Sequence, residues 1–600
     1  MFRLQTALHV GVLSATYAVL RLAAFGPWIQ ELAVFLLALL VTSFFIDALR
    51  QFLPRYVIDH RSDKAVFVTG CDTGFGHAVA RRLDALGLRV FAGCLFPDGE
   101  GARTLQRDCS SSLTVVACDV TSQEQVAAAV VRVGALLKDT KLHAVVNNAG
   151  VFTISEVEWC SLDMYRRLFE INCLGAIRVT KAFLPLVRAH GAGGRVVIVA
   201  SLAGRYTIPG LSAYSASKHA TISFADGLRR EMHKFNISVH TVEPSTYRTP
   251  ILSESVLEGT VKKDWDAAGE EVRASYGEHY RDEFKVKFMG DTEEREAGEQ
   301  DLRELHAVVN NAGVFTISEV EWCSLDMYRR LFEINCLGAI RVTKAFLPLV
   351  RAHGAGGRVV IVASLAGRYT IPGLSAYSAS KHATISFADG LRREMHKFNI
   401  SVHTVEPSTY RTPILSESVL EGTVKKDWDA AGEEVRASYG EHYRDEFKVK
   451  FMGELKNARP ASKIYEVVDD ILDATVGVEP RARYVPSAAV TLRSQLIQSL
   501  PLPVVDSMLE SRACPPTPPA AVIRQRQRQL KNPYTMPQKP FLKRFFSVPH
   551  FEKPPPSPAH DDHRPPSFAE APEQTRAEVS AESDHAPHTL SEAIAEENEE

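Results

Sequence analysis

Short apolar runs alternate with longer amphipathic stretches through the middle of the chain. The runs that predict strands lie at residues 65–69, 89–95, 113–118, 143–146, 195–200 and 237–242, and helical periodicity lies between them, for example at 77–86 and 162–174. Parallel strands buried on both faces form continuous apolar runs, and the helices that connect them cover the sheet. The pattern therefore predicts an α/β fold with a doubly wound, Rossmann-type parallel sheet, which binds ligands at the carboxyl ends of its strands.

The second half of this pattern occurs twice. Residues 142–290, here the first repeat, recur without a change at 305–453, the second repeat, behind an acidic linker at 291–304. Such identity indicates a recent exon duplication or an error in joining exons; we favour the error, which a transcript amplified across residues 290 and 291 would test. The second repeat has no copy of the first three predicted strands, so one amino-terminal half can complete only one repeat.

We expect the first repeat to complete the sheet, because it is contiguous with the amino-terminal half and docks first during synthesis. Residues 454–513, which would close the domain, then reach it only past the second repeat. In the alternative arrangement, residues 142–304 loop out and the second repeat completes the sheet. A third arrangement has the second repeat completing the sheet of a neighbouring subunit in a homo-oligomer.

The two ends differ from this pattern. Residues 1–50 hold two apolar stretches, 7–25 and 32–46, which predict a membrane anchor of one or two helices, with a buried hairpin as the alternative. Basic residues just after them favour a cytosolic-facing domain on the endoplasmic reticulum, with a mitochondrial membrane as the alternative: Arg50, Arg55, Arg61 and Lys64. Residues 514–600 are rich in Pro and Glu and are predicted to be disordered. A basic and aromatic patch at 539–546 is either solvated or in contact with anionic lipid.

Composition excludes several classes of protein. The chain of 600 residues is 45% hydrophobic and 24% charged, which is typical of a globular protein with a large core. Its net charge of −3 argues against a nucleic-acid binder that relies on a basic surface. Nine cysteines without CxxC spacing argue against a disulfide scaffold and a thiolate zinc site, and we expect no metal.

A glycine-rich turn follows the first predicted strand. Its sequence is Thr69-Gly-Cys-Asp-Thr-Gly-Phe-Gly76, between a strand and a helix. Glycines at this point let the backbone approach a pyrophosphate and direct the helix N-terminus at its charge. Asp119, directly after the third strand, is a candidate acceptor for an adenine amino group, or alternatively an ordinary helix cap.

Candidate catalytic residues follow later strands. Tyr214 and Lys218 lie one turn apart on one face of a predicted helix, and Ser201 comes directly after the fifth strand. The segment Asn147-Asn-Ala-Gly150 ends the fourth strand. Asn172, a polar residue within an apolar helical stretch, suggests backbone bracing. Each residue alone has an ordinary structural explanation, but their order on this fold indicates a catalytic site.

These motifs make the chain resemble the short-chain dehydrogenase/reductase family. The resemblance covers residues 64–290 and resumes at about 454–512, and it is closest to the membrane-associated branch that holds 3-hydroxybutyrate, retinol and 17-beta-hydroxysteroid dehydrogenases. It implies catalysis by Ser201, Tyr214, Lys218 and Asn172. It also implies cofactor contacts from Tyr214 and Lys218 and from Thr69, Gly70, Asp72, Gly74, Phe75, Gly76, Asp119, Asn147, Ala149, Gly150, Pro244 and Thr249. The chain departs from the family pattern in two ways. Ser245 stands where the family usually has Gly, and no acidic residue stands at the end of the second strand.

The resemblance implies oxidation of an alcohol with a nicotinamide cofactor. Tyr214 would be the base, and lowering its pKa from about 10 to about 7 needs roughly 4 kcal/mol, from the Lys218 cation and the positive nicotinamide. Ser201 would hold the substrate oxygen, Asn172 would link Lys218 to solvent through a water, and Thr249 would bind the carboxamide. NAD is favoured over NADP, because neither residues 93–95 nor 71–73 offer a cation for the 2′-phosphate.

Two classes of function remain open. The first is a membrane-bound enzyme that interconverts a lipophilic alcohol, a steroid or retinoid, with its carbonyl compound, with 3-hydroxybutyrate as the alternative substrate. The second is a non-catalytic scaffold, against which the intact Ser201, Tyr214 and Lys218 argue. The second repeat carries equivalents of the catalytic set, which we expect to be idle without a glycine turn: Asn335, Ser364, Tyr377 and Lys381.

Overall fold

The computed structural model describes residues 61–138, 140–189, 193–245, 254–277, 279–281, 284, 305–353, 356–412 and 417–531. The predicted membrane anchor at 1–50 and linker at 291–304 lie outside these residues, as does most of the predicted tail. Among the residues described, no helix is both long enough and apolar enough to cross a bilayer.

The first sheet confirms the predicted doubly wound architecture. Its six parallel strands have the order β3-β2-β1-β4-β5-β6. Their bounds are β1 Lys64–Thr69, β2 Arg89–Cys94, β3 Leu113–Ala117, β4 Lys141–Asn147, β5 Arg195–Val199 and β6 Ser238–Val242. The order reverses between β1 and β4, so a crevice opens at the carboxyl ends of these two strands. The amino-terminal half therefore pairs with the first repeat, through the register Val66 with Ala144.

Helices cover both faces of this sheet. The helices and helical turns of this part of the chain include α3 Gly74–Ala85, α4 Glu100–Asp108, α5 Gln123–Leu137, α6 Leu162–Phe169, η2 Glu170–Gly175, α7 Ala176–Ala189, η3 Leu202–Gly204 and α8 Ser212–Met232. Two further helices, α9 Glu254–Asp266 and α10 Glu270–Tyr276, pack around Trp159 in the loop after β4. The sequence predicts one helix over 162–174, but its second half is the π-helical segment η2, which ends before α7 begins. Such π segments are frequent at functional sites.

The second repeat forms a separate sheet of four parallel strands in the order β10-β9-β8-β7. Its elements are β7 Ala307–Asn310, α12 Leu325–Phe332, η6 Glu333–Leu337, α13 Gly338–Ala352, β8 Arg358–Val362, η7 Leu365–Gly367, α14 Ser375–Glu394, β9 Ser401–Val405, α15 Glu417–Ala430, α16 Glu433–Tyr439 and α17 Glu441–Lys456. The closing segment adds α18 Tyr465–Val476, β10 Arg483–Tyr484, α19 Ala488–Ser499 and α20 Leu502–Ala513. Strand β10 pairs with β9, so the closing segment extends the sheet of the second repeat and not that of the first.

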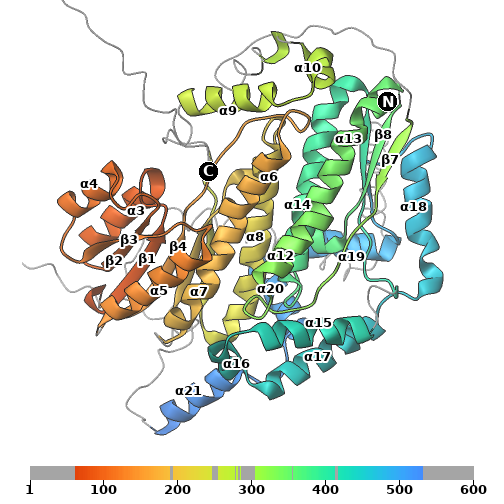
Figure 1. The fold of residues 1–600 in the computed structure, drawn as a ribbon. Helices are drawn as coiled ribbons and strands as arrows, with labels where there is room; N and C mark the ends of the chain where they lie inside the picture. The colour runs from red at the N-terminus through yellow and green to blue at the C-terminus, as the bar shows by residue number, and fades with distance from the viewer. Residues whose placement is uncertain are drawn as a thin grey trace, which may run out of the picture. The chain divides into compact units, whose positions relative to one another are not determined.

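The two repeats pack against each other through equivalent helices. Helices α8 and α14 lie side by side between the two sheets (Figure 1), with α6 and α12 beside them. Phe169 and its counterpart Phe332 meet with ring centroids 4.9 Å apart. The helices share one apolar core, because each repeat brings the same buried face to the contact.

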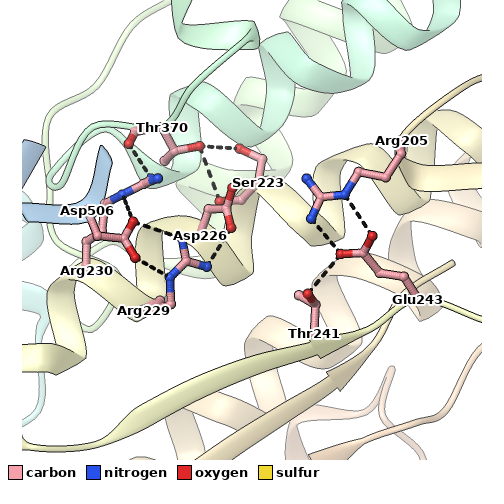
Figure 2. A network of polar contacts seen from close by, with 9 residues as sticks. All are labelled: Arg205, Ser223, Asp226, Arg229, Arg230, Thr241, Glu243, Thr370 and Asp506. Carbon is pink, nitrogen blue, oxygen red and sulfur yellow. Dashed lines mark hydrogen bonds and ion pairs between the residues drawn. The ribbon is translucent and has the colours of Figure 1, made fainter. Parts of the chain in front are cut away.

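The closing segment also contacts the first repeat. Asp506 of α20 accepts hydrogen bonds from Arg229 Nε at 2.7 Å and Arg230 Nε at 2.8 Å, both on α8 (Figure 2). Arg230 in turn donates to the Thr370 carbonyl of the second repeat at 2.6 Å. Residues 454–513 therefore bind to both repeats at once.

The prediction that disorder begins at residue 514 is wrong for part of the tail. Helix α21, Ala520–Lys531, lies inside that range. Its Ala, Arg, Gln and Leu residues favour a helix, and Ala521 and Val522 pack against the shared core. Residues 532–600 lie outside the part of the chain that the structure describes.

Candidate active site

A cavity of about 1280 Å³ lies at the carboxyl ends of the strands of the first sheet. Most of the residues singled out from the sequence line it: Gly70, Asp72, Gly74, Phe75, Asp119, Ala149, Gly150, Ser201, Tyr214, Lys218 and Pro244. Ser245, the departure from the family pattern, lines it as well. Thr249 lies outside the described residues. The fold therefore brings segments from five strand ends to one crevice, which their separate motifs predicted.

The glycine turn has the geometry of an anion site. Gly70 and Gly74 adopt φ of +68° and +62°, a region that L side chains rarely adopt. A Cβ on Gly76 would lie 2.2 Å from the Gly70 carbonyl oxygen, so this close approach also requires glycine. Thr73, which precedes α3, makes no side-chain capping bond to the helix. The first-turn amides of α3 therefore suit the pyrophosphate of a dinucleotide.

Thr69, Gly76 and Asn147 do not line the cavity, although the resemblance implied that they contact the cofactor. The Thr69 hydroxyl accepts hydrogen bonds from the backbone amides of Asn148 at 3.0 Å and Ala149 at 3.1 Å. Asn147 Nδ2 donates to Thr180 Oγ1 at 2.8 Å, toward α7. These side chains join β1, β4 and α7 and thereby hold the crevice in shape.

Asn148 contributes more to the site than the sequence suggested. Its Nδ2 donates to the carbonyl oxygens of Thr69 at 3.0 Å and Gly70 at 3.2 Å, and the residue lines the cavity. The amide thus fixes the glycine turn to the end of β4. Its place beside Asn147 in the sequence was the only signal that could have identified it.

Two acids line the end of the cavity next to β2 and β3. Asp72 accepts hydrogen bonds from the backbone amides of Leu95 at 2.9 Å and Phe96 at 2.8 Å. Its carboxylate therefore stands at the end of β2, where the sequence showed no acid in the strand itself. Asp119 accepts from Thr121 N at 2.8 Å, while Ser122 and not Asp119 caps α5.

The candidate catalytic residues lie around the start of α8. Ser201 Oγ accepts a hydrogen bond from the Ala203 amide at 3.1 Å, which fixes the turn after β5. Lys218 Nζ donates to the Val199 carbonyl at 3.1 Å and lies 5.8 Å from the centroid of the Tyr214 ring. The Tyr214 ring packs edge-on against Phe152, with centroids 4.8 Å apart. This arrangement leaves the Tyr214 and Ser201 side chains on the wall of one cavity.

Asn172 braces the site from the π-helical segment η2, and it does not line the cavity. Its Oδ1 accepts from the Val151 amide at 2.8 Å, and its Nδ2 donates to the Val151 carbonyl at 2.9 Å and to Ser217 Oγ at 3.0 Å. A Cβ on Gly150 would lie 3.2 Å from Asn172 Oδ1 and 3.6 Å from Lys218 Nζ. Backbone bracing, one interpretation of this residue, matches these contacts.

Burial changes the proton affinities of Tyr214 and Lys218, the candidate catalytic pair. It lowers the pKa of the Lys218 ammonium to about 8 and raises the pKa of the Tyr214 phenol, which a hydrogen bond with Ser201 partly offsets. The expected lowering of the tyrosine pKa is therefore not produced by the chain alone, because removing a phenolate from water costs more than these contacts return. Positive charge from a bound nicotinamide would act in the required direction.

The cavity wall next to Tyr214 is largely apolar, which the sequence could not show. Residues from two connections, the one after β4 and the one between β5 and α8, form it: Phe152, Ile154, Leu202, Tyr206, Ile208 and Leu211. Apart from Lys218, Arg167 on α6 is the only cationic side chain among the described residues of the lining. Since the loops that carry these residues have no sequence periodicity, only the fold brings them together.

The second repeat reproduces the contacts of the candidate catalytic residues. Asn335 Oδ1 accepts from the Val314 amide at 2.7 Å, Ser364 Oγ accepts from Ala366 N at 3.1 Å, and Lys381 Nζ donates to Val362 O at 3.2 Å. The Lys381 ammonium lies 6.0 Å from the Tyr377 ring centroid. Its sheet, however, contains none of β1, β2 and β3, and therefore no glycine turn.

Comparisons with known proteins agree with this geometry. The model of the short chain dehydrogenase family matches residues 64–258 and, a second time, 294–421. The 17-beta-hydroxysteroid dehydrogenase type 6 of Bos taurus is 40% identical over 39% of this chain and 73% of its own length. Retinol dehydrogenase 7 of Rattus norvegicus is 41% identical over 40% of this chain and 74% of its own. The mitochondrial D-beta-hydroxybutyrate dehydrogenase of Rattus norvegicus is 41% identical over 38% and 68%.

Proposed function

Because this chain belongs to the short-chain dehydrogenase family and is an oxidoreductase that acts on CH–OH groups, we propose that it interconverts a secondary or lipophilic alcohol with its carbonyl compound, using NAD. The alcohol is of the steroid or retinoid class. The apolar wall beside Tyr214 is the observation that carries the proposal. A flat apolar substrate gains free energy by leaving water for such a wall, at about 25 cal/mol per Å² of buried apolar surface.

Three residues of the cavity lining can each contribute to this reaction: Tyr214, Ser201 and Lys218. Tyr214 Oη would take the hydroxyl proton of the alcohol, or return it to the carbonyl oxygen. Ser201 Oγ would hold the same oxygen by a hydrogen bond and stabilise developing negative charge on it. Lys218, one helical turn beyond Tyr214, would stabilise the phenolate by its positive charge. A nicotinamide supplies the hydride chemistry when bound.

The acids near the end of β2 favour NAD over NADP. Asp72 and Asp119 line that end of the cavity, together with Leu95, Phe96 and Cys118. A 2′-phosphate placed there would meet two carboxylates and none of the arginine or lysine side chains of the described lining. A ribose 2′-hydroxyl, in contrast, can donate a hydrogen bond to a carboxylate.

A small hydroxy acid such as 3-hydroxybutyrate is the second candidate substrate, and Arg167 is the observation that favours it. The carboxylate of such a substrate needs a cation in the cavity. Arg167 lines the cavity from the solvent-exposed side of α6. The steroid or retinoid proposal requires no contact with Arg167.

A substrate panel separates the two candidates. We expect the full chain to oxidise a steroid alcohol or retinol with NAD at a kcat/KM at least about tenfold above that with NADP, and above that for 3-hydroxybutyrate. Arg167→Met should leave the lipophilic reaction unchanged, as should Arg330→Met, the same change in the second repeat. Oxidation of 3-hydroxybutyrate alone, lost in Arg167→Met and kept in Arg330→Met, would replace the lipophilic substrate by the hydroxy acid.

We also propose a membrane location for the enzyme, on the endoplasmic reticulum with its catalytic domain in the cytosol. The apolar residues 7–25 and 32–46 support it. A membrane is also the phase from which a lipophilic alcohol would enter the apolar end of the cavity.

A further inference from the structure

Glu394, the last residue of α14 in the second repeat, reaches into the first repeat. Its side chain is buried. Its Oε2 accepts a hydrogen bond from the Val157 amide at 2.7 Å. Its Oε1 accepts from the Gly210 amide at 3.2 Å and from the Ser212 hydroxyl. All three donors belong to the repeat that carries the candidate active site.

The three donors lie on the segments that shape this site. Ser212 is the first residue of α8, and Tyr214 follows it within the first turn. Gly210 precedes the helix, and its carbonyl accepts from the Ser155 amide at 2.8 Å. The segments around Val157 and Gly210 also carry Ile154, Ile208 and Leu211, which form the apolar wall. The Glu394 carboxylate therefore connects the segments around Val157 and Gly210 to the start of α8.

Neighbouring groups of the second repeat support the same segment. Lys344 of α13 donates to the Val157 carbonyl at 2.6 Å. Lys397 donates to Glu156 Oε2 and, at 2.7 Å, to the Tyr280 hydroxyl. Burial and the nearby Glu156 raise the pKa of Glu394 to about 7, while its bonds from Ser212 and Val157 and the nearby Lys397 oppose that rise. The second repeat thus holds this segment of the first repeat by charged and hydrogen-bonded side chains.

We infer that Glu394 of the second repeat is a positioning residue for the active site of the first repeat. It holds Tyr214 and the apolar wall in their relative places through Ser212, Gly210 and Val157. The second repeat then serves the enzyme even if its own Tyr377 and Lys381 take no part in the reaction. This inference rests on the proposed function.

The repeat supplies its own matched control. Glu231 of α8 is the counterpart of Glu394, and it makes the mirrored contacts: Val320 N at 2.6 Å, Gly373 N at 3.3 Å and Ser375 Oγ at 2.6 Å. These donors precede and begin α14, next to Tyr377. Because the sheet beside Tyr377 has no glycine turn, Glu231 positions a catalytic set that cannot reach a cofactor.

The test compares Glu394→Gln with Glu231→Gln in the full chain. Each substitution keeps the side-chain volume and turns an amide NH₂ toward a donor, so both should lower the melting temperature equally. Only Glu394→Gln should lower kcat and raise KM for the alcohol, with kcat/KM falling about tenfold or more, because small misplacements of reacting groups are costly. The Kd for NADH should stay unchanged in both variants, since residues 70–76 contact neither glutamate.

Equal losses of kcat/KM in the two variants would overturn the inference, since both glutamates would then act only on stability. Unchanged kinetics in Glu394→Gln would overturn it as well. If neither variant folds, Ser212→Ala and Ser375→Ala remove a single donor from each contact, and only Ser212→Ala should reduce kcat/KM. Wild-type chain that binds NADH but oxidises no alcohol of the panel would contradict the proposed function, whereas active wild type with equal variants contradicts the inference alone.

Discussion

Lys218 is a buried side chain whose pKa we expect to set the pH range of the proposed reaction. The residue is 4% exposed, and its ammonium donates to the Val199 carbonyl. Because burial disfavours the charged form, the pKa falls from the ordinary lysine value to about 8. The cation is therefore present below pH 8 and lost as the pH rises through that value.

We expect carbonyl reduction to fall as the pH rises through about 8. In the proposed mechanism, reduction needs the Tyr214 proton and the Lys218 charge. Burial raises the tyrosine pKa, so the lysine loses its proton first. The pH profile of kcat/KM for a ketone substrate with NADH checks this. In Lys218→Arg the guanidinium stays charged, so the alkaline fall should move to higher pH even if the rate is lower. An alkaline fall that stays near pH 8 in Lys218→Arg would assign it to another group.

Helices α7 and α13 have the same sequence but different surroundings. Phe183 of α7 is fully buried and stacks on Phe67 of β1, with ring centroids 4.2 Å apart, and α5 packs beside it. Its counterpart Phe346 of α13 is 43% exposed, because the second repeat has no β1 and no α5. The contribution of the same residue to the free energy of unfolding therefore depends on which elements pack against it.

Two matched substitutions should differ in cost for this reason. Phe183→Ala should lower the free energy of unfolding of the domain that holds the first sheet by about 3–5 kcal/mol, since it opens a cavity in a packed core. Phe346→Ala should cost about 1 kcal/mol or less, because its ring already contacts water. Urea denaturation followed by fluorescence measures both changes. Equal costs would mean that α13 is covered in solution as α7 is.

Each of the two sheets ends in an edge strand at a position where the counterpart strand of the other sheet has a further neighbour. Strand β4 is paired with β1, whereas its counterpart β7 is an edge strand. Strand β9 is paired with β10, whereas its counterpart β6 is an edge strand, and Val242 is 48% exposed while Val405 is fully buried. The amino-terminal half thus completes the first repeat, and the closing segment completes the second.

This division predicts which tyrosine is needed. Tyr214→Phe should reduce NAD-linked oxidation about 100-fold or more, because general acid–base catalysis is lost with the hydroxyl. Tyr377→Phe should leave the rate unchanged, because the glycine turn lies in the other sheet. Initial rates of the two variants, with NADH binding as the control for folding, decide between them. The reverse pattern would mean that the second repeat completes the cofactor-binding half.

Much of this architecture follows from local pattern. The apolar runs gave the six strands of the first sheet nearly at their observed bounds, because a strand buried on both faces admits few polar residues. Gly70 and Gly74 were identifiable because their positive φ is inaccessible to most side chains. Ser201, Tyr214 and Lys218 were identifiable because their spacing matched a strand end and one helical turn.

Other features depend on residues far apart in the chain. Thr69 and Asn147 belong to the motifs, yet Thr69 accepts from backbone amides after β4 and Asn147 donates to the Thr180 hydroxyl of α7. Asn148 and the apolar wall come to the site only through the pairing of β1 with β4 and the docking of loops. The repeats show the reason, because identical sequences have identical local conformational preferences. Only long-range packing makes Phe183 core and Phe346 surface, places β10 beside β9, and brings Glu394 to Ser212.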